Sequence, residues 1–115
     1  MMKLFFLIIL LFPLSLFAQK QGQALVDSML KQLPQLKEDT NKVKLFGSIS
    51  FEYRKFNPDE GIKYGKEGVA LSEKLGWKKG IADCANCVGI NYMSKSDFTN
   101  ALEYYFKALK PMSLT

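Results

Sequence analysis

The sequence predicts an all-α protein in which a lead helix is followed by two similar helical hairpins. Between residues 21 and 109, apolar side chains recur every three or four positions, which is the spacing of one helix face. Prolines and glycines separate these segments at positions typical of helix starts and ends. A pattern of small and aromatic residues in the first hairpin returns 39 to 40 positions later in the second. These three observations together favour a helical repeat.

Residues 1–18 are interpreted as a secretory signal peptide. A single positive charge, Lys3, precedes an uncharged run from Leu4 to Ala18. A helix of this length spans only about 22 Å, shorter than the roughly 20 residues that a membrane-crossing helix needs. The small residues Ser15 and Ala18 favour cleavage after Ala18, although Leu16 is large for such a site. We expect a periplasmic or secreted protein; the alternative is that residues 4–18 remain and anchor the chain to a membrane.

Residues 19–38 form the lead segment. Its helix is expected over residues 21–33, with an apolar stripe that consists of Leu25, Met29, Leu30 and Leu33. Pro34 disfavours continuation of this helix. We expect the lead helix to cover the open face of the first hairpin.

The first hairpin occupies residues 39–76. Its first helix is predicted from Thr40 to about Phe56, with a cap supplied by residues 38–40. The expected buried stripe of this helix is Val43, Phe46, Ile49, Ser50 and Tyr53. Asn57 and Pro58 suit the cap and first position of the second helix, which Gly76 ends.

Three glycines, Gly61, Gly65 and Gly68, share one face of that second helix. Each costs about 1 kcal/mol relative to alanine in a helix interior. We therefore expect a neighbouring helix to approach closely along this face.

The second hairpin occupies residues 77–115. Trp77 is expected to pack over the junction between the hairpins, and stacking on a ligand is its alternative role. One helix is predicted over residues 78–93, a turn over residues 94–97, and a last helix that ends near Pro111. Gly89 and Ala101 are expected where these two helices cross, because only small side chains permit close approach there.

The spacing of these residues matches most of the tetratricopeptide pattern. In the second hairpin the matching positions are Ala85, Val88, Gly89, Tyr92, Ala101, Tyr105 and Ala108, and in the first they are Phe46, Ile49, Ser50, Tyr53, Gly61, Gly65 and Gly68. The period exceeds the roughly 34 residues of the common repeat. Over about residues 39–109 the chain resembles the longer-repeat tetratricopeptide segments of exported or sensor-attached bacterial proteins.

The resemblance implies a short right-handed solenoid that binds a protein or peptide and is not an enzyme. In this family the first helix of each repeat lines a concave groove. Carried over position by position, the groove residues are Lys44, Ser48, Phe51 and Lys55 in the first repeat and Asp83, Asn86, Cys87 and Ile90 in the second, with Gly47 and Ser94 beside them. Phe51 and Ile90 occupy equivalent places and form an apolar spot, unless they pack against the lead helix or a downstream helix.

The resemblance also implies a second possible role, as the sensory input segment of a histidine kinase or transcription regulator. In addition, helical repeats normally end in a polar capping helix, and none is predicted after Pro111. We therefore expect the last hairpin either to be truncated and to need downstream sequence, or to self-associate through its exposed apolar face.

The residue types present argue against catalysis and against cofactors. The chain has no histidine, which excludes Ser–His and Cys–His nucleophiles and histidine-bearing zinc sites. It has no glycine-rich phosphate loop, and its acidic residues are scattered. The net charge is +5, but the basic residues are dispersed, so no nucleic-acid partner is expected.

Cys84 and Cys87 form a C-x2-C pair. A four-thiolate zinc site needs two more cysteines than the chain has, unless a dimer supplies them. A disulfide three residues apart in a regular helix is strained. We interpret the pair as two small helix residues; the alternative is a redox pair, and the sequence leaves the redox state of the two thiols open.

Overall fold

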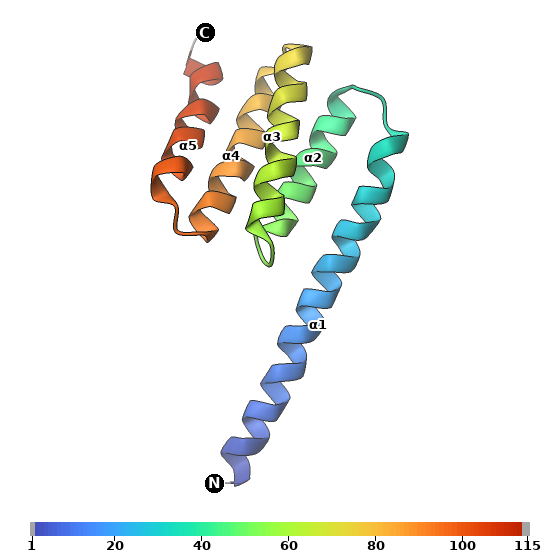
Figure 1. Cartoon of the computed structure of the whole chain (residues 1–115), viewed down its shortest axis with the longest axis vertical. Helices are drawn as coiled ribbons and strands as arrows, with labels where there is room; N and C mark the ends of the chain where they lie inside the picture. The colour runs from blue at the N-terminus through green and yellow to red at the C-terminus, as the bar shows by residue number, and fades with distance from the viewer. Residues whose placement is uncertain (1, 114–115) are drawn as a thin grey trace.

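The computed structural model describes residues 2–113, and the side chains of residues 16–110. The helices in this range are α1 (Met2–Gln32), α2 (Thr40–Tyr53), α3 (Pro58–Leu75), α4 (Lys78–Ser94) and α5 (Phe98–Ser113), with a short 3-10 helix, η1 (Leu33–Gln35), after α1. In Figure 1, α2 to α5 stand side by side as two antiparallel hairpins, and α1 extends well beyond them. The predicted lead helix and two helical hairpins are confirmed.

Local capping explains where α2 and α3 begin. The Asp39 carboxylate accepts hydrogen bonds from the backbone N–H groups of Asn41 and Lys42 at 2.9 and 3.3 Å. Asn57 caps α3 by accepting from Glu60 N–H, and Pro58 occupies the first turn. Gly76 ends α3 in the left-handed region at φ 66°.

Two predicted helix ends differ from the structure. α2 ends at Tyr53 rather than near Phe56, because residues 54–56 bond three positions back and form a tighter turn before the Asn57 cap. At the other end of the chain, α5 continues through Pro111 to Ser113.

α1 is one helix from Met2, much longer than the predicted lead helix of residues 21–33. The segment interpreted as a signal peptide therefore continues the lead helix, and the predicted cleavage site after Ala18 lies within α1. In the part of the chain that the structure describes, no helix has both the length and the apolar character to cross a membrane. The C-terminal half of α1 covers the first hairpin as expected, because Val26 is fully buried with Ile49 and Tyr53 of α2.

The predicted stripe of α2 is buried throughout: Val43, Phe46, Ile49, Ser50 and Tyr53. Val43 and Phe46 belong to a core that continues through α3 into α4, where Cys84 and Ala85 are buried, and reaches Ala108 of α5. Trp77, at the start of α4, packs against this shared core, which confirms its place at the junction. The two hairpins therefore share one core.

Glycines allow α3 to lie against both α2 and α4. A Cβ atom added at Gly65 would lie 2.6 Å from Val88 Cγ2 and 2.8 Å from Ser50 Oγ, and one added at Gly68 would lie 2.6 Å from Cys84 Sγ. In the second hairpin, a Cβ at Gly89 would meet the Tyr105 ring at 2.6 Å, and Ala101 is fully buried. The predicted crossing points are confirmed.

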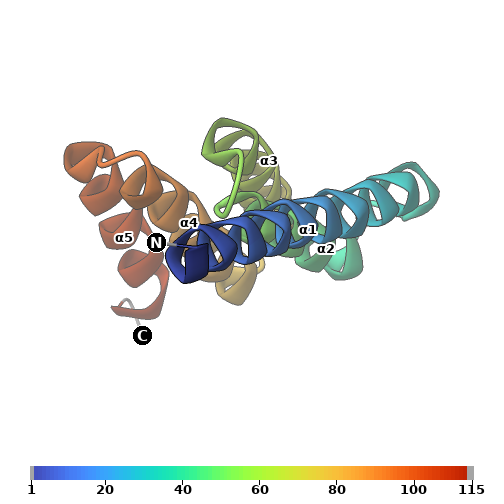
Figure 2. The same cartoon turned by 90° about the horizontal axis from the view of Figure 1, so that it is seen from below.

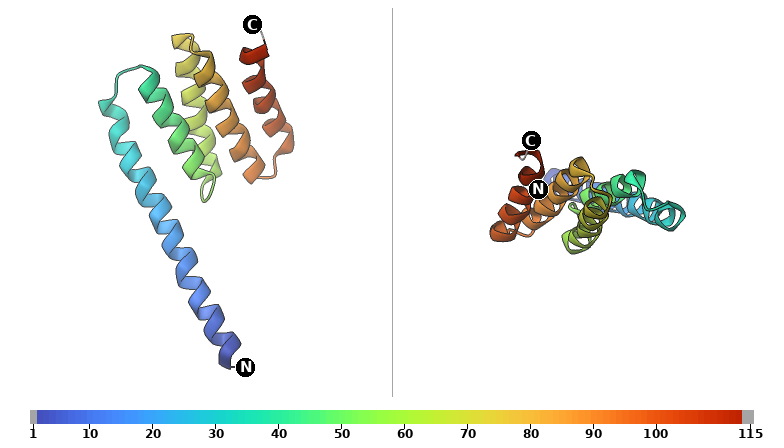
Figure 3. Two further views of the ribbon diagram at one scale, coloured as in Figure 1. Left: turned by 180° about the vertical axis from the view of Figure 1, so that it is seen from behind. Right: turned by 90° about the horizontal axis from the view of Figure 1, so that it is seen from above.

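This packing leaves α2 and α4 in contact with each other. Seen from below and from above, α3 lies on one side of the α2–α4 pair (Figure 2 and Figure 3). The first helices of the two hairpins therefore present a joint surface on the other side.

Candidate functional site

A hollow of about 330 Å³ lies between α2 and α4. We call it the α2–α4 hollow, and its lining residues are Val43, Lys44, Gly47, Ser48, Phe51, Trp77, Gly80, Asp83, Cys84 and Cys87. Five predicted groove residues meet there: Lys44, Ser48, Phe51, Asp83 and Cys87. The packing of α2 against α4 thus brings together predicted residues that are far apart in the sequence.

The other three predicted groove residues lie elsewhere. Lys55 lines a separate hollow against α1 and pairs with Glu52 at 3.1 Å. Asn86 is exposed on α4 and Ile90 is half-buried on the same helix, and neither lines the α2–α4 hollow.

The hollow exists because two glycines lie in its lining. A Cβ added at Gly47 would be in ordinary contact, 3.7 Å from Cys84 Sγ, so this position has free space above it. A Cβ at Gly80 would collide with the Trp77 ring and with Ser72 Oγ. Gly80 thus allows the indole to lie close against the first turn of α4, as one wall of the hollow.

Phe51 forms the exposed apolar part of the hollow. The residue is 42% exposed. The core between α1 and α2 is formed instead by Val26 with Ile49 and Tyr53, and Phe56 packs against it.

Arg54 is a site residue that the sequence reasoning missed. Its guanidinium carbon lies 3.6 Å from the centroid of the Phe51 ring, and its Nη1 donates to the Phe51 carbonyl at 2.7 Å. The residue belongs to the turn after α2 and is not one of the positions carried over as groove residues. The only sequence signal for it was its i+3 spacing from Phe51.

The charges around the hollow are unbalanced. Among the described residues, Lys44 and Arg54 form no ion pair with a carboxylate, whereas Asp83 is paired with Lys79 at 2.9 Å. The surroundings of the hollow therefore hold two positive charges without a carboxylate partner.

The two cysteines lie at the base and wall of the hollow as free thiols, Cys84 buried and Cys87 half-buried. Burial raises the pKa of the Cys84 thiol to about 12 and that of Cys87 to about 11. Thiolates are the nucleophilic and metal-binding form of cysteine, so both groups are in their unreactive form at neutral pH. Within the described residues, no group of three or more cysteine or acidic side chains could hold a metal ion.

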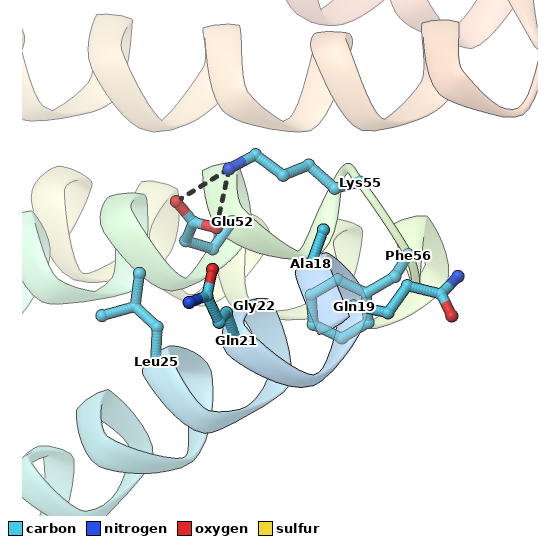
Figure 4. Close-up of a pocket in the computed structure, with 8 residues that line it drawn as sticks. All are labelled: Ala18, Gln19, Gln21, Gly22, Leu25, Glu52, Lys55 and Phe56. Carbon is cyan, nitrogen blue, oxygen red and sulfur yellow. Dashed lines mark hydrogen bonds and ion pairs between the residues drawn. The ribbon is translucent and has the colours of Figure 1, made fainter. Parts of the chain in front are cut away.

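A larger hollow, of about 430 Å³, lies between α1 and the end of α2 and was not predicted. Figure 4 shows its residues: Ala18, Gln19, Gln21, Gly22, Leu25, Glu52, Lys55 and Phe56. Its two charged groups already pair with each other, since Lys55 Nζ bonds both oxygens of Glu52. We therefore consider the α2–α4 hollow the better candidate site.

The chain is similar to a tetratricopeptide repeat protein of Trypanosoma brucei brucei, "Tetratricopeptide repeat protein 29". The two sequences are 32% identical over 62 residues, which cover 54% of this chain and 13% of the relative. No family model matches the chain, and no solved structure matches it. The similarity and the paired helices together indicate a tetratricopeptide-like repeat, a fold typical of protein interaction.

Proposed function

We propose that this protein is a non-catalytic module that binds a protein or peptide partner through the joint surface of α2 and α4. The observation that carries the proposal is the convergence of Lys44, Ser48, Phe51, Asp83 and Cys87 on one hollow. A surface of apolar and polar groups between parallel repeat helices suits an extended or helical peptide. The similarity to a tetratricopeptide repeat protein supports protein partners in general.

We further propose that the module acts outside the cytoplasm, in the periplasm or as a secreted protein. The uncharged N-terminal run followed by small residues supports export. N-terminal sequencing of the protein from the cells that make it tests this. A chain that begins at Gln19 is expected, and an intact N-terminus in the membrane fraction would favour the anchored form and its sensory role.

The apolar face of α5 supports self-association as a second interaction. Phe98, Leu102, Phe106 and Leu109 are between 55% and 66% exposed. Ile62 and Val69, which stand 40 positions before Leu102 and Leu109, are buried in α3, on which α4 packs. The corresponding face of α5 has no cover within the described residues. Because the face is uncharged along this stripe, the same face of a second copy is a suitable partner.

Site-specific photo-cross-linking tests the proposed binding surface. A photoreactive phenylalanine analogue at Ser48, in the hollow, is compared with the same analogue at Ala70, which is exposed on α3. In cells that make the full chain, we expect discrete cross-linked products from position 48 that are absent from position 70. Identical products from both positions, or none from either, would contradict the proposal.

A further inference from the structure

We propose that the α2–α4 hollow binds one bulky apolar side chain of an acidic peptide segment, with Arg54 as the residue that selects for acidic neighbours. This inference rests on the proposed function, because it specifies the ligand of the same surface. It follows from the size of the hollow, its lining and the charges around it.

The size of the hollow suits a side chain rather than a cofactor. Its volume of about 330 Å³ is at the lower end of the roughly 300–1,000 Å³ found for small-molecule sites. The open position above Gly47 gives an incoming group access toward Cys84 at the base.

The lining of the hollow suits an apolar group. Phe51 and Trp77 contribute aromatic surface, and Val43 and the neutral thiol of Cys84 lie deeper. The Cys84 thiol already points to the Val43 carbonyl, at 3.8 Å, so the base offers no free strong hydrogen-bonding group to a polar ligand. Apolar anchors that fill such pockets commonly dominate the energy of peptide binding.

The charges around the hollow select the residues next to the anchor. Lys44 and Arg54 have no carboxylate partner among the described side chains, and Asp83 is neutralised by Lys79. The whole chain is also positive, at +5. Charge complementarity therefore favours a segment that carries Asp or Glu beside its apolar residue.

Arg54 is already oriented for this role. Its guanidinium is held on the Phe51 ring and bonded to the Phe51 carbonyl. A guanidinium has five N–H donors in a planar fork, so most of them remain for a carboxylate. Because the group is fixed before binding, little side-chain entropy is lost when it pairs with the ligand.

Selection from a random-peptide phage library on the immobilised full chain provides the probes. Selected peptides are synthesised with a fluorescent label, and their affinity is measured by anisotropy. Two variants test the inference: Gly47→Leu, which fills the hollow from an open position, and Arg54→Gln. Lys31→Gln is the matched control, because it removes one positive charge from an exposed site at the end of α1.

We expect the selected peptides to share an aromatic residue or leucine flanked by Asp or Glu. Gly47→Leu should abolish binding while leaving the melting temperature unchanged or higher. Arg54→Gln should weaken binding by at least about ten-fold, corresponding to the loss of a charge-assisted pair, and Lys31→Gln by less than about two-fold.

The outcomes separate the two proposals. The selected peptides could fail to bind Gly47→Leu and yet lack acidic residues, or bind Arg54→Gln as tightly as the unaltered chain. Either result would overturn this inference and leave the proposed function standing. Peptides that bind Gly47→Leu as tightly as the unaltered chain, or no selected peptide at all, would overturn both.

Discussion

At the scale of single residues, Asn91 joins three helices through a buried amide. Its Nδ2 donates to the Ser50 and Cys87 carbonyls, both at 2.9 Å, and Ser50 Oγ donates to the Gly61 carbonyl at 2.6 Å. Asn91 Oδ1 has no hydrogen-bond partner and faces the position that a Gly61 side chain would occupy. Close packing at this junction therefore depends on a glycine at position 61.

Gly61→Ala should destabilise the fold, because the collision of its methyl group with the Asn91 amide costs about 1–3 kcal/mol. Alanine offsets this by about 1 kcal/mol through its higher helix propensity, so we expect a net loss of up to about 2 kcal/mol. Gly47→Ala is the control, since its methyl group would be in ordinary contact, and it should be stabilising. Urea unfolding checks both, and equal effects of the two substitutions would show that the crossing is looser than described.

The buried thiols predict that the free energy of unfolding falls as the pH becomes alkaline. Burial raises the pKa of Cys84 and Cys87 above the ordinary value of 9.0. Above that pH the unfolded chain loses thiol protons while the folded chain keeps them. The thiols' contribution to stability is therefore complete below about pH 9 and is lost between about pH 9 and pH 12.

The free energy of unfolding in urea, measured with reductant at about pH 8 and about pH 10, checks this expectation. The unaltered chain should lose more stability over this interval than a Cys84→Ala, Cys87→Ala double variant does. An identical loss in both proteins would assign the pH dependence to other groups.

At the scale of helices, the helix starts and ends that a capping residue sets could be predicted from the sequence. The end of α2 and the length of α1 could not. Asp39, Asn57 and Gly76 act on neighbouring backbone groups, so their roles followed from the sequence alone. The end of α2 depends on how residues 54–56 turn toward the Asn57 cap. The length of α1 was missed because residues 1–18 were interpreted as a cleaved signal or a membrane anchor, separate from the lead helix.

Asp39→Ala should cost about 0.5–2 kcal/mol, because two N–H groups at the start of α2 lose their acceptor. Glu103→Ala, at an exposed position of α5, should change stability by no more than about 0.5 kcal/mol. Thermal melts of the two variants compare them directly. A melting temperature of Asp39→Ala as high as that of Glu103→Ala would show that the cap contributes little.

At the scale of the whole molecule, the repeat register predicted about half of the residues that line the α2–α4 hollow. Lys44, Ser48, Phe51, Asp83 and Cys87 lie together on one hollow because equivalent positions of α2 and α4 face the same way. Arg54 escaped prediction because position 54 is not among the groove positions carried over from the resemblance. Lys55 fell outside the hollow because it lies in the turn after α2, where it pairs with Glu52. Asn86 is exposed and Ile90 half-buried on α4, and neither lines the hollow.

Self-association is the second prediction at this scale. Sedimentation velocity of the full chain should show a concentration-dependent dimer, because the stripe of Phe98, Leu102, Phe106 and Leu109 is uncovered. Phe106→Glu should shift the protein to monomer, whereas Glu103→Gln should leave the dimer unchanged. A monomer at high concentration with a sharp, high melting transition would contradict the expectation.

The most direct test of the central claim is an NMR titration of the full chain with a peptide selected on it. The α2–α4 surface predicts that the largest amide shifts occur at Gly47, Ser48, Phe51, Gly80 and Cys87. Shifts confined to α3 or α5, with these five amides unmoved at saturation, would contradict the assignment of the binding site to this surface.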